Sequence, residues 1–314
     1  MSDLDREAIV IGCEDFDAAL AFYTEELGFR LDMIMPADSP RTALLSGYGI
    51  RVRLLGGARP TFARSSGDWA KGRAGMEYRD LIPDRCGGRF IASHIRILGG
   101  GPVPDYVHYH KIRFQMIYCR RGWVRAVYED QGPPFVMNAG DCVLQPPEIR
   151  HRVLECSPGL EVIEVGCPAE HETWRDHDLP LPTNAHRPNR DFGGQRFVRH
   201  IAAEAVWTRD PAGAFGVRDT GIGEATRRLA GVRVLRMAAS AGPVHRAHAG
   251  EFLFYYVLNG GVRTSDGRDL QPDDTVLVPA GAQLTVEAFK SADLLEVSLP
   301  AVATSRSALC KVPV

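Results

Sequence analysis

Residues 101–122 read GPVPDYVHYHKIRFQMIYCRRG, and residues 140–151 read GDCVLQPPEIRH. The first segment holds His108 and His110, which are separated by one residue in a predicted β-strand. Because successive side chains of a strand alternate between its two faces, both imidazoles point to the same side. A third histidine, His151, ends the second segment. Three imidazoles that converge from two strands suit a first-row divalent metal, so the sequence predicts a metal site.

The two segments resemble the two sequence motifs of the cupin superfamily, Gly-X5-His-X-His-X(3,4)-Glu-X6-Gly and Gly-X5-Pro-X-Gly-X2-His. The positions that match residue by residue are His108, His110, Gly122, Gly140, Pro146 and His151. Two positions differ, because Gln115 replaces the Glu of the first motif and Glu148 replaces a Gly of the second. The resemblance implies a barrel that holds one divalent transition metal, with Fe(II) favoured and Ni, Mn, Zn or Cu as alternatives.

The substitution at position 115 changes the charge expected at this site. A carboxylate would leave the metal and its ligands with one net positive charge, whereas the neutral amide of Gln115 leaves two. A more cationic centre is a stronger Lewis acid and favours an anionic chelator, such as an enolate, an enediolate or a catecholate. The predicted ligands are therefore His108, His110, Gln115 and His151. The alternative is a site of three histidines with Gln115 beside it.

The chain from 78 to 314 contains an internal repeat. Residues 116–124 (MIYCRRGWV) resemble 254–262 (FYYVLNGGV), and residues 140–151 resemble 273–284. Five such pairs of segments follow in the same order, at separations of 132 to 141 positions. They are short β-rich runs bounded by Gly, Pro and Asp, which predicts two antiparallel barrels in tandem. Together with the resemblance, this predicts a mainly β bicupin.

The second barrel has lost most of the predicted ligands. Aligned on Gly260, the residues at the four ligand positions are Arg246, His248, Leu253 and Leu284. One ligand of four remains, so we expect a degenerate barrel with a structural role or a part in a dimer interface. A shifted site made of His245, His248 and Glu251 is the alternative.

The N-terminal part predicts a smaller module. An apolar strand at 8–11, a helix from Asp15 or Asp17 to Gly28, and three further strands up to Leu55 give the order βαβββ. With the segment DFDAALAFYTEELGFRLDM, this order resembles one half of a vicinal-oxygen-chelate (glyoxalase) module. The first strand has no histidine, and a lone open sheet has an edge and a face to cover. A docking or dimerisation role is therefore favoured over a metal site.

These features divide the chain into five parts. They are a vicinal-oxygen-chelate-like module (1–58), a linker (59–77), the metal-binding barrel (78–170), an inter-barrel connection (171–205) and the degenerate barrel (206–314).

Composition excludes several classes of protein. Lys plus Arg is 37 and Asp plus Glu is 39, and the net charge of −2 argues against a nucleic-acid partner. No apolar run approaches 18 residues, so no membrane span is expected. The acidic residues Met1–Glu7 do not resemble a signal peptide, and the seven cysteines contain no Cys-X-X-Cys. We expect a cytoplasmic protein, a homodimer, with a small-molecule substrate.

Three further residues are candidates for catalysis. Tyr106 shares the predicted face of the two strand histidines and could supply an acid or a hydrogen bond. Arg113 shares the face of the amide ligand if the strand is regular, and could fix a carboxylate. Glu148 precedes the last histidine near the expected barrel mouth and could be a general base. Each is equally an ordinary lining, rim or solvated residue. His171 and His177, in the acidic joining segment, are expected on the surface.

The function that these features favour is a metal-dependent enzyme that acts on a small oxygenated metabolite, namely an enol, a diketone or a phenolic or carboxylate compound. A dioxygenase is favoured, because the cupin resemblance implies either dioxygenation or non-redox chemistry. The alternative is an isomerase, cyclase or lyase that works through a metal-stabilised enolate. A bicupin that binds a ligand without turnover is the third possibility.

Overall fold

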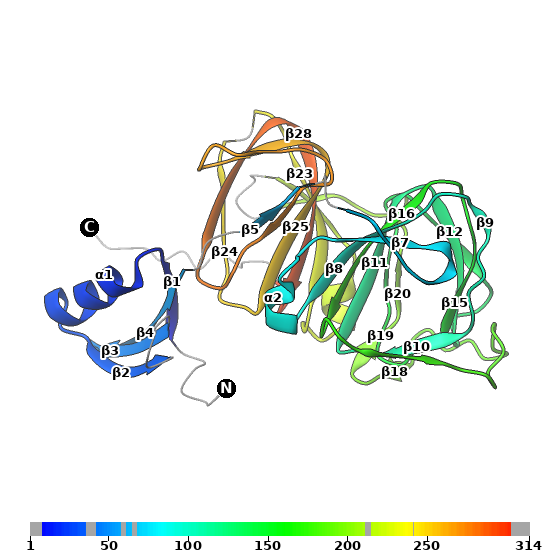
Figure 1. Ribbon diagram of the computed structural model, residues 1–314, viewed down its shortest axis with the longest axis horizontal. Helices are drawn as coiled ribbons and strands as arrows, with labels where there is room; N and C mark the ends of the chain where they lie inside the picture. Colours follow the sequence, from blue (N-terminus) through cyan, green and yellow to red (C-terminus); the bar gives the residue numbers. More distant parts are fainter. Residues whose placement is uncertain are drawn as a thin grey trace. The chain divides into compact units, whose positions relative to one another are not determined.

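The structure is a computed structural model that describes residues 8–35, 42–57, 61–64, 68–210, 215–240 and 242–302. It is built mainly of β-strands (Figure 1). The chain divides into two compact units, one made of Met1–Phe62 with Arg236–Val314 and the other of Ala63–Leu235. Among the described residues, no helix has the length and apolar character needed to cross a membrane.

The N-terminal module has the predicted βαβββ order. Its elements are β1 (Ile9–Cys13), α1 (Phe16–Ala21) with a π-helical turn (Phe22–Glu26), β2 (Arg30–Met35), β3 (Thr42–Gly47) and β4 (Ile50–Gly56). The sheet order is β1-β4-β3-β2, with β1 parallel to β4 (Figure 1). Asp15 caps α1, because its carboxylate accepts a hydrogen bond from the amide of Ala18 at 2.9 Å. Phe16 packs against Leu45 and Leu54 of the sheet in one apolar cluster.

Two sheets form the first barrel. One contains β9 (Gly101–Pro102), β10 (His108–Lys111), β12 (Trp123–Tyr128), β13 (Phe135–Asn138), β15 (His151–Cys156) and β17 (Glu172–Arg175). The other contains β6 (Ala70–Lys71), β7 (Glu77–Asp80), β8 (Ile91–Ile97), β11 (Phe114–Arg121), β14 (Cys142–Leu144), β16 (Leu160–Cys167) and β20 (Val198–His200). Their orders are β13-β12-β15-β10-β17, with β9 on β15, and β20-β14-β11-β16-β8-β7-β6.

The backbone conformation explains why the two motifs have glycine at positions 122 and 140. Gly122, in the turn between β11 and β12, has φ of 74°, and a Cβ there would lie 2.2 Å from the Oγ of Ser157. Gly140, which precedes β14, has φ of 98°. Both conformations are ones that side chains with a Cβ rarely adopt, so these glycines are needed to turn the chain.

The barrel is larger than the sequence predicted. Strand β6 lies inside the predicted linker 59–77 and pairs with β7. Strands β17 and β20 lie inside the predicted connection 171–205, where they pair with β10 and β14. These short strands extend the sheets past β7, β10 and β14, whose edges would otherwise present unpaired backbone groups. They are too short to show periodicity, which is why the sequence did not predict them.

The second barrel repeats the first. Its strands include β24 (Val244–Ala247), β25 (Phe252–Thr264), β26 (Asp269–Leu270), β27 (Thr275–Leu277) and β28 (Gln283–Leu299). Arg246 on β24 lies opposite Leu284 on β28, as His108 on β10 lies opposite His151 on β15. The predicted alignment of these positions is therefore confirmed. Fully buried Phe252, Phe254 and Tyr256 contribute to its core.

The remaining elements have four residues or fewer, apart from the last of them, which has seven. They are β5 (Thr61–Ala63), a 3-10 turn (Arg73–Gly75), α2 (Arg85–Gly88), β18 (Asp191–Phe192), β19 (Gln195–Arg196), β21 (Thr208–Arg209), β22 (Gly216–Asp219), α3 (Ile222–Ala225) and β23 (Gly231–Met237). The six described cysteines are all free, and Cys310 lies outside the described residues.

Candidate metal centre

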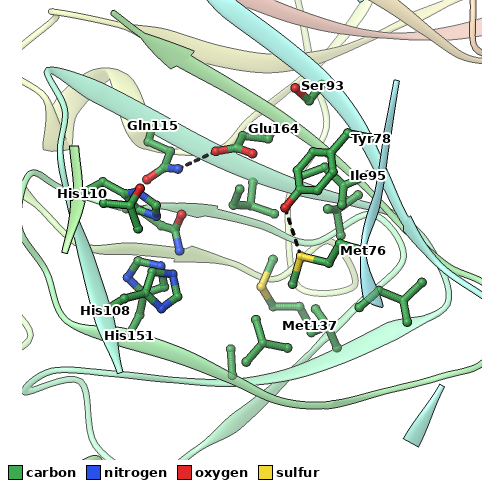
Figure 2. Close-up of a pocket in the computed structure, with 18 of the residues that line it drawn as sticks. Met76, Tyr78, Ser93, Ile95, His108, His110, Gln115, Met137, His151 and Glu164 are labelled. Carbon is green, nitrogen blue, oxygen red and sulfur yellow. Dashed lines mark hydrogen bonds between the residues drawn. The ribbon is translucent and has the colours of Figure 1, made fainter. Parts of the chain in front are cut away.

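Three predicted histidines meet inside the first barrel (Figure 2). The register places His108 opposite His151, with their ring centroids 4.2 Å apart. His110, two residues along β10, has its ring centroid 5.2 Å from that of His108 and 5.3 Å from that of His151. One ring nitrogen of each lies within 4.8 Å of the other two. Strand alternation on β10 and the pairing with β15 thus produce the cluster.

Hydrogen bonds at Nδ1 fix the orientation of the three imidazole rings. The Nδ1 atoms of His108 and His151 lie 2.8 and 3.0 Å from the carbonyl oxygens two residues earlier in the chain. Because a carbonyl only accepts, each Nδ1 carries a proton, so Nε2 is the nitrogen that can act as a metal ligand. The Nδ1 of His110 lies 2.8 Å from the Oγ1 of Thr173. Anchored Nδ1 atoms are typical of metal-binding histidines, so this donor set fits a divalent transition metal.

A buried carboxylate lies behind the histidines. One carboxylate oxygen of Asp105 is 3.7 Å from the Nδ1 of His108, and its side chain is fully buried. The other oxygen accepts a hydrogen bond from the backbone amide of Val153 at 3.0 Å. A carboxylate on the Nδ1 side of a histidine is a typical outer contact of metal sites.

Gln115 approaches from the facing sheet, on β11, and is buried. Its Nε2 donates a hydrogen bond to Oε1 of Glu164 at 2.5 Å. A carboxylate accepts and cannot donate, so the amide nitrogen must face Glu164 and the amide oxygen must face the other way. In Figure 2 that oxygen points toward His110. The predicted fourth ligand therefore turns its donor oxygen to the histidines.

Glu164 is the residue that sequence reasoning missed. It lies on β16, opposite Ile117 of β11 and Ser93 of β8, and it lines the cavity. A signal was available, because the repeated segments IEVGCPA (163–169) and LEVSLPA (295–301) both carry Glu at their second position.

The histidines stand at one side of a cavity of about 290 Å³. Half of the residues that line it are aliphatic or methionine, and among the described lining residues there is no Lys or Arg. Figure 2 shows the labelled apolar side chains Met76, Ile95 and Met137 across the cavity from the histidines. The site is thus a polar, metal-ligating end attached to an apolar chamber.

The three predicted catalytic side chains do not line this cavity. Strand β10 begins only at His108 and β11 only at Phe114, so alternation cannot be extended to positions 106 and 113. Tyr106 instead stacks under the guanidinium of Arg175, 4.8 Å from its ring centroid, and lines a separate surface pocket. Arg113 is exposed in the bend before β11.

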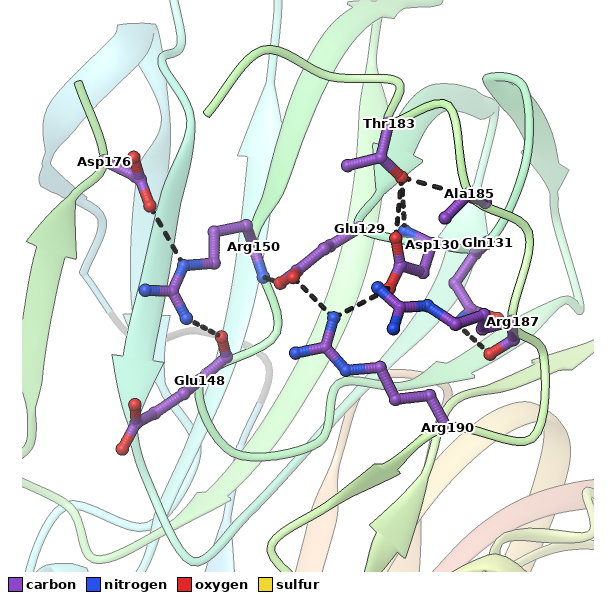
Figure 3. Close-up of polar contacts among 10 residues, drawn as sticks. All are labelled: Glu129, Asp130, Gln131, Glu148, Arg150, Asp176, Thr183, Ala185, Arg187 and Arg190. Atoms are coloured by element: carbon purple, nitrogen blue, oxygen red, sulfur yellow. Dashed lines mark hydrogen bonds and ion pairs between the residues drawn. The ribbon is translucent and has the colours of Figure 1, made fainter. Parts of the chain in front are cut away.

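Glu148 contacts the site with its backbone and not with its carboxylate. Its φ is 61°, which explains why the cupin motif has Gly at this position. Its amide donates a hydrogen bond to the carbonyl oxygen of His110 at 3.0 Å. The side chain is exposed, and in Figure 3 its carboxylate takes part in no marked contact.

His171 was expected on the surface, and this expectation is wrong. It is half-buried and lines the cavity, with its ring centroid 5.3 Å from that of His110. The reason is the unpredicted strand β17, which pairs with β10 and so carries the preceding residue to the histidines. His177 is exposed, as expected.

The chain that follows β17 is fastened to the barrel by ion pairs (Figure 3). Arg150, next to His151, donates to Asp176 at 3.0 Å. Arg190 donates to Glu129 at 2.6 Å and to Asp130 at 2.8 Å.

Asp130 is the centre of this network. Its side chain is 2% exposed and also accepts from Arg187 at 2.6 Å and from Thr183 at 2.9 Å. Burial alone would raise the pKa of Asp130, but the hydrogen bonds from Arg190 and Thr183 and the two arginine charges lower it. The carboxylate is therefore held ionised.

The second barrel holds an ion pair where the first holds the histidines. Arg246, at the position of His108, forms an ion pair with Glu296, at the position of Glu164, and donates to the hydroxyl of Tyr255 at 2.8 Å. Burial and the charge of Glu296 raise the pKa of Tyr255, so the phenol is neutral. A guanidinium supplies the positive charge here. The first-barrel histidines form the one group of three metal-ligating side chains among the described residues, so the shifted site at His245 is not found.

Comparisons with known proteins agree with this architecture. An oxalate decarboxylase variant from Bacillus subtilis has a TM-score of 0.55 at 15% identity, over 77% of this chain and 78% of that one. Protein Ylba from E. coli (DUF861) has a TM-score of 0.56 at 12% identity, over 77% and 91%. Oxalate decarboxylase from Lactobacillus farciminis, in a formate complex, has a TM-score of 0.54 at 16% identity, over 77% and 86%.

The chain has the cupin fold. The predicted mainly β architecture with tandem cupin barrels is thereby confirmed. No family model matches the sequence, and no curated protein matches it. At these identities the likeness concerns the fold alone, and the resemblance of the N-terminal module to vicinal-oxygen-chelate proteins stays a prediction.

Replacement of Glu164 by Gln tests the orientation of the fourth ligand. An uncharged amide at 164 no longer forces the Gln115 oxygen toward the histidines, so we expect metal affinity to fall about 10–100-fold. Competition with a chromophoric chelator measures this. Glu161→Gln, on the same strand but bonded to His94, is the matched control and should bind metal as wild type does. Equal affinity of the Glu164→Gln protein would contradict the assignment.

Replacement of Asp130 by Asn tests the ion-pair network. Because the pKa of Asp130 is lowered in the folded state, its contribution to stability is present above about pH 4 and is lost as pH falls through the folded pKa. We expect the variant to lose about 1–3 kcal/mol at pH 7 and to approach wild type below about pH 4. Urea denaturation at both pH values measures this, with the exposed Asp178→Asn as the control. A deficit that does not change with pH would refute the electrostatic role.

Proposed function

We propose that this protein is a metal-dependent cupin enzyme whose first barrel binds one divalent transition ion through His108, His110 and His151, with Gln115 as the fourth donor. The observation that carries the proposal is the convergence of three histidines whose Nδ1 atoms are anchored, at one end of a cavity of about 290 Å³. A group of core histidines would need no chamber beside it. The substrate is a small oxygenated molecule, such as an enol, a diketone, a phenol or a carboxylate.

When bound, such an ion supplies Lewis-acid polarisation of a carbonyl or enol oxygen and, in the case of Fe(II), redox chemistry with dioxygen. The chain supplies two groups that can move a proton. Glu164 is a half-buried carboxylate that faces the cavity, and His171 is a half-buried imidazole beside His110. They replace Tyr106, Arg113 and Glu148 as the candidates for acid–base work.

Tyr128, which also lines the cavity, is not a third such group. Its hydroxyl accepts a hydrogen bond from Gln145 at 2.9 Å, and burial raises its pKa far above the ordinary value. The phenol therefore stays neutral, and Tyr128 only lines the cavity.

The reaction is proposed to be of the dioxygenase type. The neutral amide of Gln115 in place of a carboxylate favours an anionic enolate or catecholate ligand, which both dioxygenation and enolate chemistry require. An isomerase, cyclase or lyase is therefore the second candidate, and the oxalate decarboxylases that share this fold carry a lyase name. A homodimer and a cytoplasmic location stay predictions.

An oxygen electrode separates these candidates. We expect Fe(II)-loaded protein to consume oxygen in step with an enol, diketone or phenol from a substrate panel, and His151→Ala to lose at least about 100-fold of that rate because a metal ligand is gone. His177→Ala, exposed and away from the cavity, is the matched control. Substrate conversion without oxygen uptake would contradict the dioxygenase and favour the non-redox enzyme. Saturable binding of a compound that is returned unchanged would overturn the enzyme proposal itself.

A further inference from the structure

The part of the cavity away from the histidines differs from the histidine end in the side chains that line it. This part is lined mainly by apolar side chains such as Met76, Ile95 and Met137, together with the hydroxyl-bearing Tyr78 and Ser93. The volume of the whole cavity, about 290 Å³, is many times the ~15 Å³ that a cavity needs to hold a single water. A chelator of two oxygens and two or three carbons would leave most of this space unfilled.

The charges around the cavity limit what it can hold. Among the described residues that line it, Glu164 carries the one carboxylate, and no Lys or Arg is present. A divalent ion and Glu164 together leave one positive charge for a ligand. Asp105, buried behind His108, adds a second negative charge, so no positive charge is left over for a second carboxylate on the ligand. A second carboxylate on the ligand would be buried among uncharged side chains without a cation, which disfavours its binding.

Resting on the proposed function, we infer that the ligand of the first barrel is a monoanionic or neutral oxygen chelator carried on an apolar body, and not a small dicarboxylate. The two oxygens bind at the histidine end, where the single charge of an enolate is neutralised. The apolar body lies against Ile95 and Met137, which Figure 2 shows across the cavity from the histidines. This specificity would differ from that named for the oxalate decarboxylases of the same fold.

Ligand binding to Co(II)-loaded protein tests the inference without any turnover. The visible absorption of the ion is followed while three probes are added, namely 1-phenylbutane-1,3-dione, pentane-2,4-dione and oxalate. The two diketones share one chelating group and differ in the apolar body, whereas oxalate has neither the body nor the single charge. We expect the phenyl compound to bind at least about tenfold more tightly than pentanedione, because its ring is buried in the chamber. Oxalate should bind more weakly than both.

A pair of variants locates the apolar body. Met137→Lys places a cation in the chamber and should weaken the phenyl compound at least about tenfold while oxalate binds more tightly, whereas Met137→Leu keeps the volume and should keep the wild-type order of affinities. Co(II) binding shows that each variant is folded.

Tighter binding of oxalate than of the phenyl compound by wild-type protein, or equal binding of the two diketones, would overturn the inference and leave the metal site standing. Absence of Co(II) binding, seen before any probe is added, would overturn the proposed function and this inference with it.

Discussion

The pairing of β10 with β15 is the constraint on which the site depends. It places His108 opposite His151, and the two-residue period of β10 adds His110 on the same face. Backbone carbonyls at the Nδ1 side of two rings then turn their Nε2 atoms inward. A slip of the register by one residue would move the histidines of β10 away from the cavity, so strand pairing itself forms the proposed metal site. The unpredicted strand β17 supports it from the other edge of β10 and supplies Thr173 to His110.

Each barrel contains a carboxylate at the corresponding position, and the two barrels surround it with different side chains. In the first, imidazoles and the amide of Gln115 surround a space in which a cation can be bound, and Glu164 faces that space. In the second, Arg246 carries a cation on the chain itself and pairs it with Glu296. A buried carboxylate without a partner is strongly destabilising, and Arg246 supplies the partner of Glu296. The carboxylate repeated at positions 164 and 296 is thus common to both barrels, while its partner is the amide of Gln115 in the first and the guanidinium of Arg246 in the second.

Much of this was predictable from the sequence. Spacing on one strand predicted the face shared by His108 and His110, and the internal repeat predicted the tandem barrels and the lost second site. Alternation failed where strands end, which is why Tyr106 and Arg113 were placed in the cavity although β10 and β11 begin after them. Glu164 and His171 reach the cavity through pairing with distant strands, β11 in one case and β10 in the other. Such pairings are not visible in the local sequence pattern. The motif comparison singled out Glu148 because it replaces a Gly. That position requires a left-handed backbone conformation, which says nothing about a catalytic role for the side chain.

The central claim is that one barrel of the two binds a metal through its histidines. Metal content by mass spectrometry tests it most directly, on wild type, His110→Ala and, as the matched second-barrel variant, His248→Ala. The account predicts about one transition-metal ion per chain in wild type and in His248→Ala, and none in His110→Ala, because the first-barrel histidines are the one ligand cluster among the described residues. Wild-type protein without metal after reconstitution, or metal retained by His110→Ala, would contradict it.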